Sequence, residues 1–197
     1  MLNVGLLKTH LESAAHSSGM KRIVIAYWLI PAEPARSSFQ SLINNLAQLY
    51  NAPVFEPHVT VHVAASCTSA VDGVLSKAAQ GFEQIVLQTL EVSGSSEFIK
   101  TLFVQFAMNR QLERLNRSIR HAAQDLSDYL LNPHLSLLYK RMSNQDRCLL
   151  TYSIELPFPE VIFGSLKAVR CISPTRSRAD VEAWEVVAEK PLGSTGV

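Results

Sequence analysis

A strand–helix–strand unit that ends in Pro-His-x-Thr/Ser occurs twice in this chain. The first copy covers Ile23 to Val63 and ends in Pro57-His58-Val59-Thr60-Val61. The second covers Thr101 to Tyr139 and ends in Pro133-His134-Leu135-Ser136-Leu137. In both copies the histidine follows the start of the first strand at almost the same distance. The repeat predicts an internal duplication, with two similar lobes that meet near a pseudo-twofold axis.

Hydrophobic periodicity places these motifs on strands. Residues 23–30 form a continuous apolar run, which is typical of a buried strand. From Pro34 to Tyr50 the apolar residues recur three and four positions apart, which predicts a helix. The same reasoning predicts helices over 69–80, 110–127 (with Leu126 on the apolar face) and 144–152. Further strands are predicted over 58–63, 84–92, 100–107, 134–139, 161–172 and 181–188.

Length and charge bound the organisation and the partners. The chain has 197 residues, 47% of them apolar, and a formal net charge of +1. We expect one domain over residues 23–192, an N-terminal extension over 1–22 and a mobile tail over 193–197. A near-neutral chain neutralises few phosphates, so the composition favours a small anionic ligand over a long nucleic acid.

The cysteines and the hydropathy bear on where the protein is located in the cell. Cys67, Cys148 and Cys171 are an odd number without a Cys-x-x-Cys motif, so neither a disulfide framework nor a zinc knuckle is predicted. No apolar run approaches the ~18 residues that a membrane helix needs. We therefore expect a cytoplasmic protein that has no membrane segment and is a monomer.

Alternation along a strand brings together the histidine and the hydroxyl of each motif. Positions i and i+2 point to the same face and lie ~7 Å apart, so His58 and Thr60 share a face. His134 and Ser136 do likewise. If the lobes face each other, two imidazoles and two hydroxyls converge on one cleft.

This set of groups suits phosphodiester chemistry. Imidazole titrates near pH 6.5, so one ring can take a proton from an attacking water while the other gives a proton to the leaving oxygen. The hydroxyls can donate hydrogen bonds to the non-bridging oxygens as charge builds on phosphorus. The scheme needs neither a metal nor a cofactor, and a strained cyclic phosphate suits it because its ring opens readily.

A metal site formed by His58 and His62 is the alternative that their spacing suggests. On a helix, positions i and i+4 would share a face, as in zinc proteases. The β-branched Val59, Val61 and Val63 instead predict a strand, in which the two positions are ~13 Å apart. We therefore expect no metal here. His62 is predicted to lie on the His58 face, one pleat further, either lining the cleft or at its rim.

Either motif taken alone is more often a structural histidine than a catalytic one. The repeat favours the functional interpretation, because the same proline precedes each histidine and a hydroxyl follows each at the same spacing. Trp184 is predicted to pack in the core, whereas Trp28 fits either the core or a stacking role against a base or ribose.

The remaining polar residues are predicted to lie at the surface. His10 and His16 are expected to be solvent-exposed. A stripe of positive residues on the helix over 110–127 is expected to be its solvated side. The stripe consists of Arg110, Arg114, Arg117 and His121. Loop cations that could reach a pyrophosphate are Lys140, Arg141, Arg176 and Arg178.

Three stretches, together with Glu182–Ala188, carry a likeness to a known group of proteins. They are Trp28-Leu29-Ile30-Pro31, Pro57-His58-Val59-Thr60-Val61 and Asn132-Pro133-His134-Leu135-Ser136-Leu137-Leu138-Tyr139. Over residues 23–192 the chain resembles the two-histidine (2H) phosphoesterase superfamily, and within it the plant-type cyclic phosphodiesterases. The resemblance implies a bilobal α+β, ligase-like fold, with two pseudo-symmetric antiparallel sheets around a central cleft and helices outside.

The resemblance also implies residue roles and an activity. It makes His58 and His134 the acid–base pair and Thr60 and Ser136 the phosphate clamps. It places Tyr139 in the site and Trp28 near it. The implied enzyme opens ADP-ribose 1″,2″-cyclic phosphate and hydrolyses nucleoside 2′,3′-cyclic phosphates to 2′-phosphates. The alternatives are an RNA-end 2′,3′-cyclic phosphodiesterase of the 2′-5′ ligase-like branch, and a nucleotide-binding module with little turnover.

Overall fold

The computed structural model describes residues 20–65, 70–127 and 129–193. Most of the expected extension over 1–22, with His10 and His16, lies outside these residues. So do Cys67 and nearly all of the expected tail.

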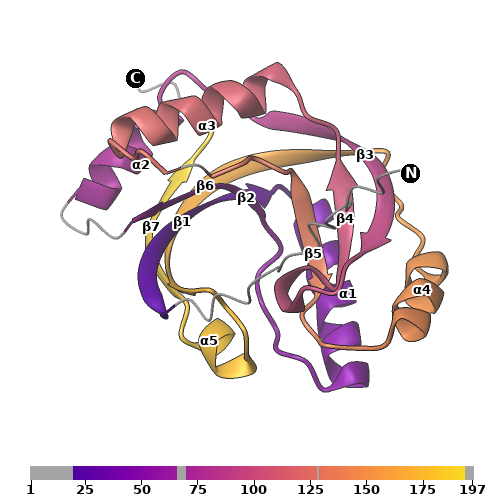
Figure 1. The fold of residues 1–197 in the computed structure, drawn as a ribbon. Helices are drawn as coiled ribbons and strands as arrows, with labels where there is room; N and C mark the ends of the chain where they lie inside the picture. The colour runs from indigo at the N-terminus through magenta and orange to yellow at the C-terminus, as the bar shows by residue number, and fades with distance from the viewer. Residues whose placement is uncertain (1–19, 66–69, 128, 194–197) are drawn as a thin grey trace, which may run out of the picture.

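The two predicted units are present as matching strand–helix–strand segments (Figure 1). The first consists of β1 (Arg22–Pro31), α1 (Ala35–Tyr50) and β2 (Val59–Ala65). The second consists of β4 (Leu102–Phe106), α3 (Arg110–Ala122) and β5 (His134–Leu138). The other elements are α2 (Val71–Ala79), β3 (Ile85–Gly94), the short 3-10 helix η2 (Phe98–Lys100), α4 (Asn144–Ser153), β6 (Glu160–Ser173), α5 (Arg178–Glu182) and β7 (Glu185–Pro191).

The strands form one closed antiparallel arrangement. The order is β1-β2-β5-β4-β3-β6-β7, and β6 also pairs with β1. The start of β6, Glu160–Phe163, pairs with β3, and the stretch from Phe163 to Ser173 pairs with β1. The two predicted sheets are therefore the halves β7-β6-β1-β2 and β6-β3-β4-β5. They merge into one seven-stranded sheet because β6, with 14 residues, is long enough to belong to both.

A single residue pair closes the other side of this arrangement. Val59 of β2 pairs with Leu135 of β5, and both side chains are completely buried. These are the residues between the histidine and the hydroxyl of each predicted motif. The two repeated units therefore meet at the centres of their motifs.

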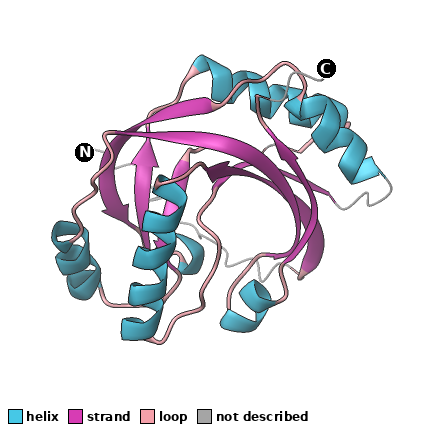
Figure 2. Ribbon diagram, turned by 180° about the vertical axis from the view of Figure 1, so that it is seen from behind, coloured by secondary structure: helices cyan, strands magenta, loops and turns pink. Residues whose placement is uncertain are grey.

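Helices cover the outside of the strands, as both ribbon views show (Figure 2). The helix of each unit packs across onto the second strand of the other unit, because α1 contacts β5 and α3 contacts β2. Phe39 of α1 and Leu115 of α3 belong to the same buried cluster. This reciprocal packing holds the two copies together and supports the predicted duplication.

The structure corrects the end of the helix predicted over 110–127. α3 ends at Ala122, and Gln124 then adopts a left-handed φ of 50°. The Arg120 guanidinium donates hydrogen bonds to the carbonyl oxygens of Asp125 and Ser127, which fixes the chain in a non-helical path. Leu126 is therefore 94% exposed and not part of the apolar face.

We predict that Leu115→Ala and Leu126→Ala differ sharply in their effect on stability. Leu115 is completely buried, so its truncation should lower the free energy of unfolding by about 2–5 kcal/mol. Leu126→Ala should change that free energy by less than about 0.5 kcal/mol. Urea unfolding of both variants checks this, and equal losses would contradict the end of α3 at Ala122.

Candidate active site

A pocket of about 490 Å³ opens where the two repeated units meet. Its walls come from β1, β2, β5 and β6, from the segments that follow β3, β5 and β6, and from those that precede β5 and β7. All six residues predicted for the site line it, namely Trp28, His58, Thr60, His134, Ser136 and Tyr139. This volume is within the range of small-molecule sites, about 300–1,000 Å³.

The Val59–Leu135 pair fixes how the two motifs face each other. In an antiparallel pair, one step to either side of this bridge sets His58 opposite Ser136 and Thr60 opposite His134. Directly opposed residues lie about 5 Å apart and diagonal ones about 7–8 Å apart. The two histidines therefore occupy one diagonal of a four-residue patch and the two hydroxyls occupy the other. A tetrahedral phosphate can bind over the centre of such a patch.

Both imidazoles are held by the same local hydrogen bond. Nδ1 of His58 lies 2.6 Å from the carbonyl oxygen of Glu56, and Nδ1 of His134 lies 2.8 Å from that of Asn132. In each copy the acceptor is the residue two positions before the histidine. A carbonyl oxygen can only accept, so each Nδ1 carries the proton. The neutral rings then present an unprotonated Nε2 as the remaining polar atom.

An aromatic ring supports each imidazole from the neighbouring strand. Trp28 lies opposite Thr60 and stacks on His58 with ring centroids 3.7 Å apart and an interplanar angle of 11°. Phe103 lies opposite Ser136 and meets His134 edge-on, with centroids 5.5 Å apart. These equivalent positions restrict the rotation of both imidazole rings.

Burial keeps both imidazoles neutral in the free pocket. It lowers the pKa of His58 to about 4, and the Glu56 carbonyl only partly offsets this effect. Burial also lowers the pKa of His134, the Asn132 carbonyl opposes this, and the charge of Lys100 lowers it further. An anion bound between the rings would favour the protonated form of either ring.

The other predicted residues stand around this pair. The Ser136 hydroxyl donates to the carbonyl oxygen of Ile99 at 2.8 Å, whereas Thr60 is half-buried at the pocket wall. β5 carries a bulge at Leu137, because Phe103 pairs with Ser136 while Leu102 pairs with Leu138. The extra residue reverses the alternation, so Tyr139, which follows the last residue of β5, reaches the pocket. Burial raises the pKa of Tyr139, which keeps its hydroxyl protonated.

His62 does not lie on the face expected for it. β2 carries a bulge at Val61, because Trp28 pairs with Thr60 while Tyr27 pairs with His62. The extra residue reverses the alternation, so His62 turns away from the pocket and is buried beside Tyr27. Its Nε2 lies 2.8 Å from the Asp125 carboxylate. Burial lowers the pKa of His62, and Asp125 opposes this shift.

Three aromatic residues in the pocket were not predicted there, namely Phe98, Tyr129 and Trp184. Trp184 packs against the core, as expected, and also lines the pocket, where it meets Trp28 edge-on at 5.2 Å. Its Nε1 is buried and has no hydrogen-bond partner among the described residues. Tyr129 also lines the pocket and donates its hydroxyl proton to the carbonyl oxygen of Thr60. None of these three positions carries a local pattern that would have identified it, because all three reach the pocket through the closure of the fold.

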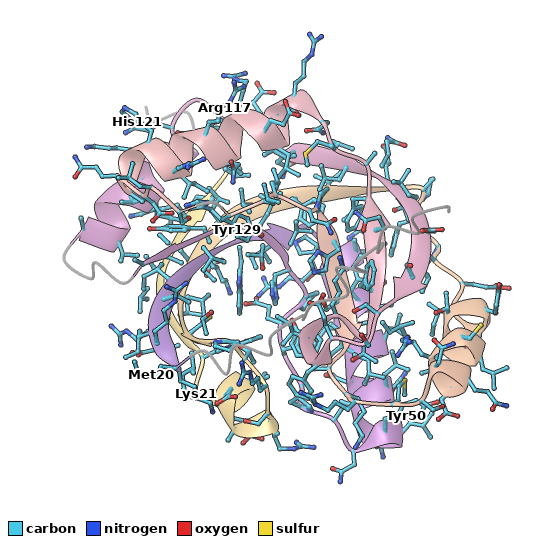
Figure 3. All side chains as sticks on the ribbon, in the orientation of Figure 1. Met20, Lys21, Tyr50, Arg117, His121 and Tyr129 are labelled. Atoms are coloured by element: carbon cyan, nitrogen blue, oxygen red, sulfur yellow. The ribbon has the colours of Figure 1, made fainter. Side chains whose placement is uncertain are left out.

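The predicted cations divide into two groups. Arg141 and Arg176 line the pocket, whereas Lys140 and Arg178 do not. The stripe on α3 is solvent-exposed, and Figure 3 shows Arg117 and His121 on the outer helix. Within the described ranges, no group of three His, Cys, Asp or Glu side chains could hold a metal ion. No helix in the described part of the chain is long and apolar enough to cross a membrane.

Comparisons with known proteins give a matching family, similar relatives and solved structures of similar fold. The family described as "Cyclic phosphodiesterase-like protein" matches residues 23–192. A cyclic phosphodiesterase of Arabidopsis thaliana is 23% identical, over 86% of this chain and 95% of that protein. A 2′,3′-cyclic-nucleotide 3′-phosphodiesterase of Eremothecium gossypii is 27% identical, over 86% and 100%. The structure of E. coli LigT complexed with 3′-AMP has a TM-score of 0.52 at 14% identity, over 86% and 96%.

We predict that the protein is less stable in mild acid than at neutral pH and that His58 causes part of this loss. The pKa of His58 is about 4 in the native state and near 6.5 when unfolded, so between these values the unfolded chain binds the extra proton. The free energy of unfolding should fall by about 3 kcal/mol from this residue as the pH drops from 6.5 to 4.

Urea unfolding at pH 7 and pH 4.5 checks this prediction in the wild type and in His58→Gln. The variant should lose less stability on acidification than the wild type. His121→Gln, altered on the exposed face of α3, is the matched control. An unchanged acid sensitivity in His58→Gln would show that burial of this ring does not set its pKa.

Proposed function

Since the chain belongs to the cyclic phosphodiesterase-like family, within the 2H phosphoesterase superfamily, we propose that it opens the cyclic phosphates of small nucleotides. Membership of this family means that the chain is an enzyme that hydrolyses cyclic phosphates. The proposed reactions convert ADP-ribose 1″,2″-cyclic phosphate to ADP-ribose 1″-phosphate and nucleoside 2′,3′-cyclic phosphates to 2′-phosphates. The observation that carries the proposal is the pair of imidazoles, His58 and His134, held in the same tautomer on one diagonal of a shared patch.

In the proposed mechanism the two histidines divide the proton transfers. The anionic phosphodiester binds between His58 and His134 and favours a proton on one of them. Nε2 of the neutral ring takes a proton from water as the water oxygen forms a bond to phosphorus. Nε2–H of the charged ring gives a proton to the leaving ribose oxygen as the P–O bond breaks. The ring opens to a phosphomonoester, and a further proton exchange with water resets the pair.

The hydroxyls stabilise the charge that develops on the phosphoryl oxygens. Thr60 and Ser136 occupy the other diagonal of the patch and can donate to the non-bridging oxygens. Ser136 must first turn its proton from the carbonyl of Ile99 toward the ligand. This exchange replaces one hydrogen bond by another, so it costs little.

The pocket supports a small nucleotide as the substrate. Trp28, Tyr139 and Trp184 provide apolar ring surface, which suits a base or a ribose. Arg141 and Arg176 can bind a second phosphate, which favours ADP-ribose 1″,2″-cyclic phosphate over a mononucleotide. The names of the relatives with cyclic phosphodiesterase activity, and the 3′-AMP bound to LigT, agree with a nucleotide ligand.

The RNA-end alternative makes a different demand on the surface. An RNA substrate needs a longer track of basic groups leading to the pocket, and salt should then weaken binding steeply. The net charge of +1 favours the small substrate. We also propose that the protein is cytoplasmic and monomeric.

We predict that His58→Ala and His134→Ala each lower kcat by about 10²–10⁴, because each removes one proton transfer. The double variant should be scarcely slower than either single variant, because the two rings act as a unit. Product formation from ADP-ribose 1″,2″-cyclic phosphate and from the four 2′,3′-cyclic mononucleotides measures this. His121→Ala is the control for loss of a surface imidazole. Multiplying losses in the double variant would refute a shared mechanism.

We also predict full activity after dialysis against EDTA. The proposed proton transfers use side chains alone, so chelation should change neither kcat nor KM. The same assay with added zinc or magnesium provides the comparison. Loss of turnover in EDTA that a metal restores would overturn the metal-free mechanism.

A further inference from the structure

The residue two positions before each histidine makes two kinds of contact, one through its backbone carbonyl and one through its side chain. Its carbonyl oxygen accepts from the imidazole Nδ1, and its side chain is bound to a strand of the sheet. In the first copy this residue is Glu56, and in the second it is Asn132. We propose that Lys167 with Glu56 and Gln105 with Asn132 are positioning pairs that set the tautomer and direction of His58 and His134. The effect on turnover rests on the proposed function, but the effect on the tautomers does not.

The first pair is a partly buried ion pair, in which the Glu56 side chain is 20% exposed. Nζ of Lys167 lies 2.8 Å from each carboxylate oxygen of Glu56, and Arg36 also contacts this carboxylate. Lys167 is only 7% exposed, on β6, directly opposite Trp28 of β1. Trp28 stacks on the His58 ring, whereas Lys167 binds Glu56, the residue whose carbonyl oxygen holds that ring. The neighbouring residues Trp28 and Lys167 therefore both support His58.

The position of this ion pair indicates what it contributes. A buried lysine is costly unless it is paired, and a buried ion pair adds little net stability over apolar residues of the same size. Glu56 lies in the irregular segment between α1 and β2, where no strand hydrogen bonds fix the backbone. The ion pair ties this segment to β6 two residues before the imidazole. We infer that its contribution is orientation.

The second pair does the same with neutral groups. Nε2 of Gln105 donates to Oδ1 of Asn132 at 3.0 Å and to the carbonyl oxygen of Pro133 at 2.8 Å. Gln105 is on β4, directly opposite His134 of β5. Two different chemistries therefore fix the equivalent carbonyl in the two copies. A shared sequence motif would not have revealed them, because the partner residues are distant in the chain.

The test removes each strand partner and reads the imidazole directly. Lys167→Met and Gln105→Met keep the length of the side chain and remove the polar contact. Two-dimensional ¹H–¹⁵N spectra of the imidazoles report the tautomer without requiring turnover. We expect only the Nδ1–H form for both rings in the wild type. The Nε2–H form should appear at His58 in Lys167→Met and at His134 in Gln105→Met.

Kinetics on the same variants provides the second readout. Each should lose about tenfold in kcat, the scale of other supporting contacts, while KM stays within about twofold because the pocket lining is intact. Lys167→Arg keeps the positive charge and should therefore retain most of the wild-type kcat. Arg170→Met removes an ion pair with Glu185 from the same strand, and Gln88→Met removes an amide contact with Glu160. Both controls should leave the tautomers and kcat unchanged.

The outcomes separate this proposal from the proposed function. Unchanged tautomers in both variants would overturn the positioning role even if the enzyme is active. A wild type that does not turn over cyclic phosphates, with tautomers that change as expected, would overturn the function alone. If Lys167→Met fails to fold, Glu56→Gln weakens the same contact at constant length, and an unchanged His58 tautomer in that variant would count against the proposal.

Discussion

The pairing of Val59 with Leu135 is the contact on which the site depends. Among the described residues it is the only strand pairing between the two repeated units, and it lies between the histidine and the hydroxyl of each motif. A shift of either strand by one residue in this register would turn the histidine and the hydroxyl of that strand to the buried face and bring its central residue, Val59 or Leu135, into the pocket. The full burial of both side chains prevents that shift, because exposing either one would lose apolar contacts.

The rest of the fold holds this contact in place. β6 closes the far side of the sheet, and each unit sends its helix across to the other unit, so neither half can move alone. The symmetry extends to the supports of the imidazoles, which use a carbonyl two residues before, an aromatic ring from the neighbouring strand and a side-chain anchor. The copies differ in detail, since Trp28 stacks on His58 whereas Phe103 meets His134 edge-on. These differences give the two rings unlike environments, as the two unlike proton transfers of the proposed mechanism require.

The sequence predicts the strands, the four longer helices and the central four residues of the site because these follow from periodicity and from the repeat. It does not predict α5, where the expected strand over 181–188 begins instead as a helical turn. It fails where a non-local contact decides. The bulge at Val61 reverses the direction of His62, and the hydrogen bonds of Arg120 end α3 before Leu126. Trp184 reaches the pocket only because β7 pairs with β6. Alternation alone places Tyr139 on the face opposite His134, whereas the bulge at Leu137 turns it toward the pocket.

The central claim is that one phosphate group contacts both histidines at once. The most direct measurement is a titration of the wild-type protein with inorganic phosphate, followed through the imidazole nitrogen resonances of His58 and His134. We expect both Nε2 signals to move together with one dissociation constant and a stoichiometry of one phosphate per chain. Movement of only one ring, or two separate dissociation constants, would show that the two imidazoles serve different environments and would contradict the account.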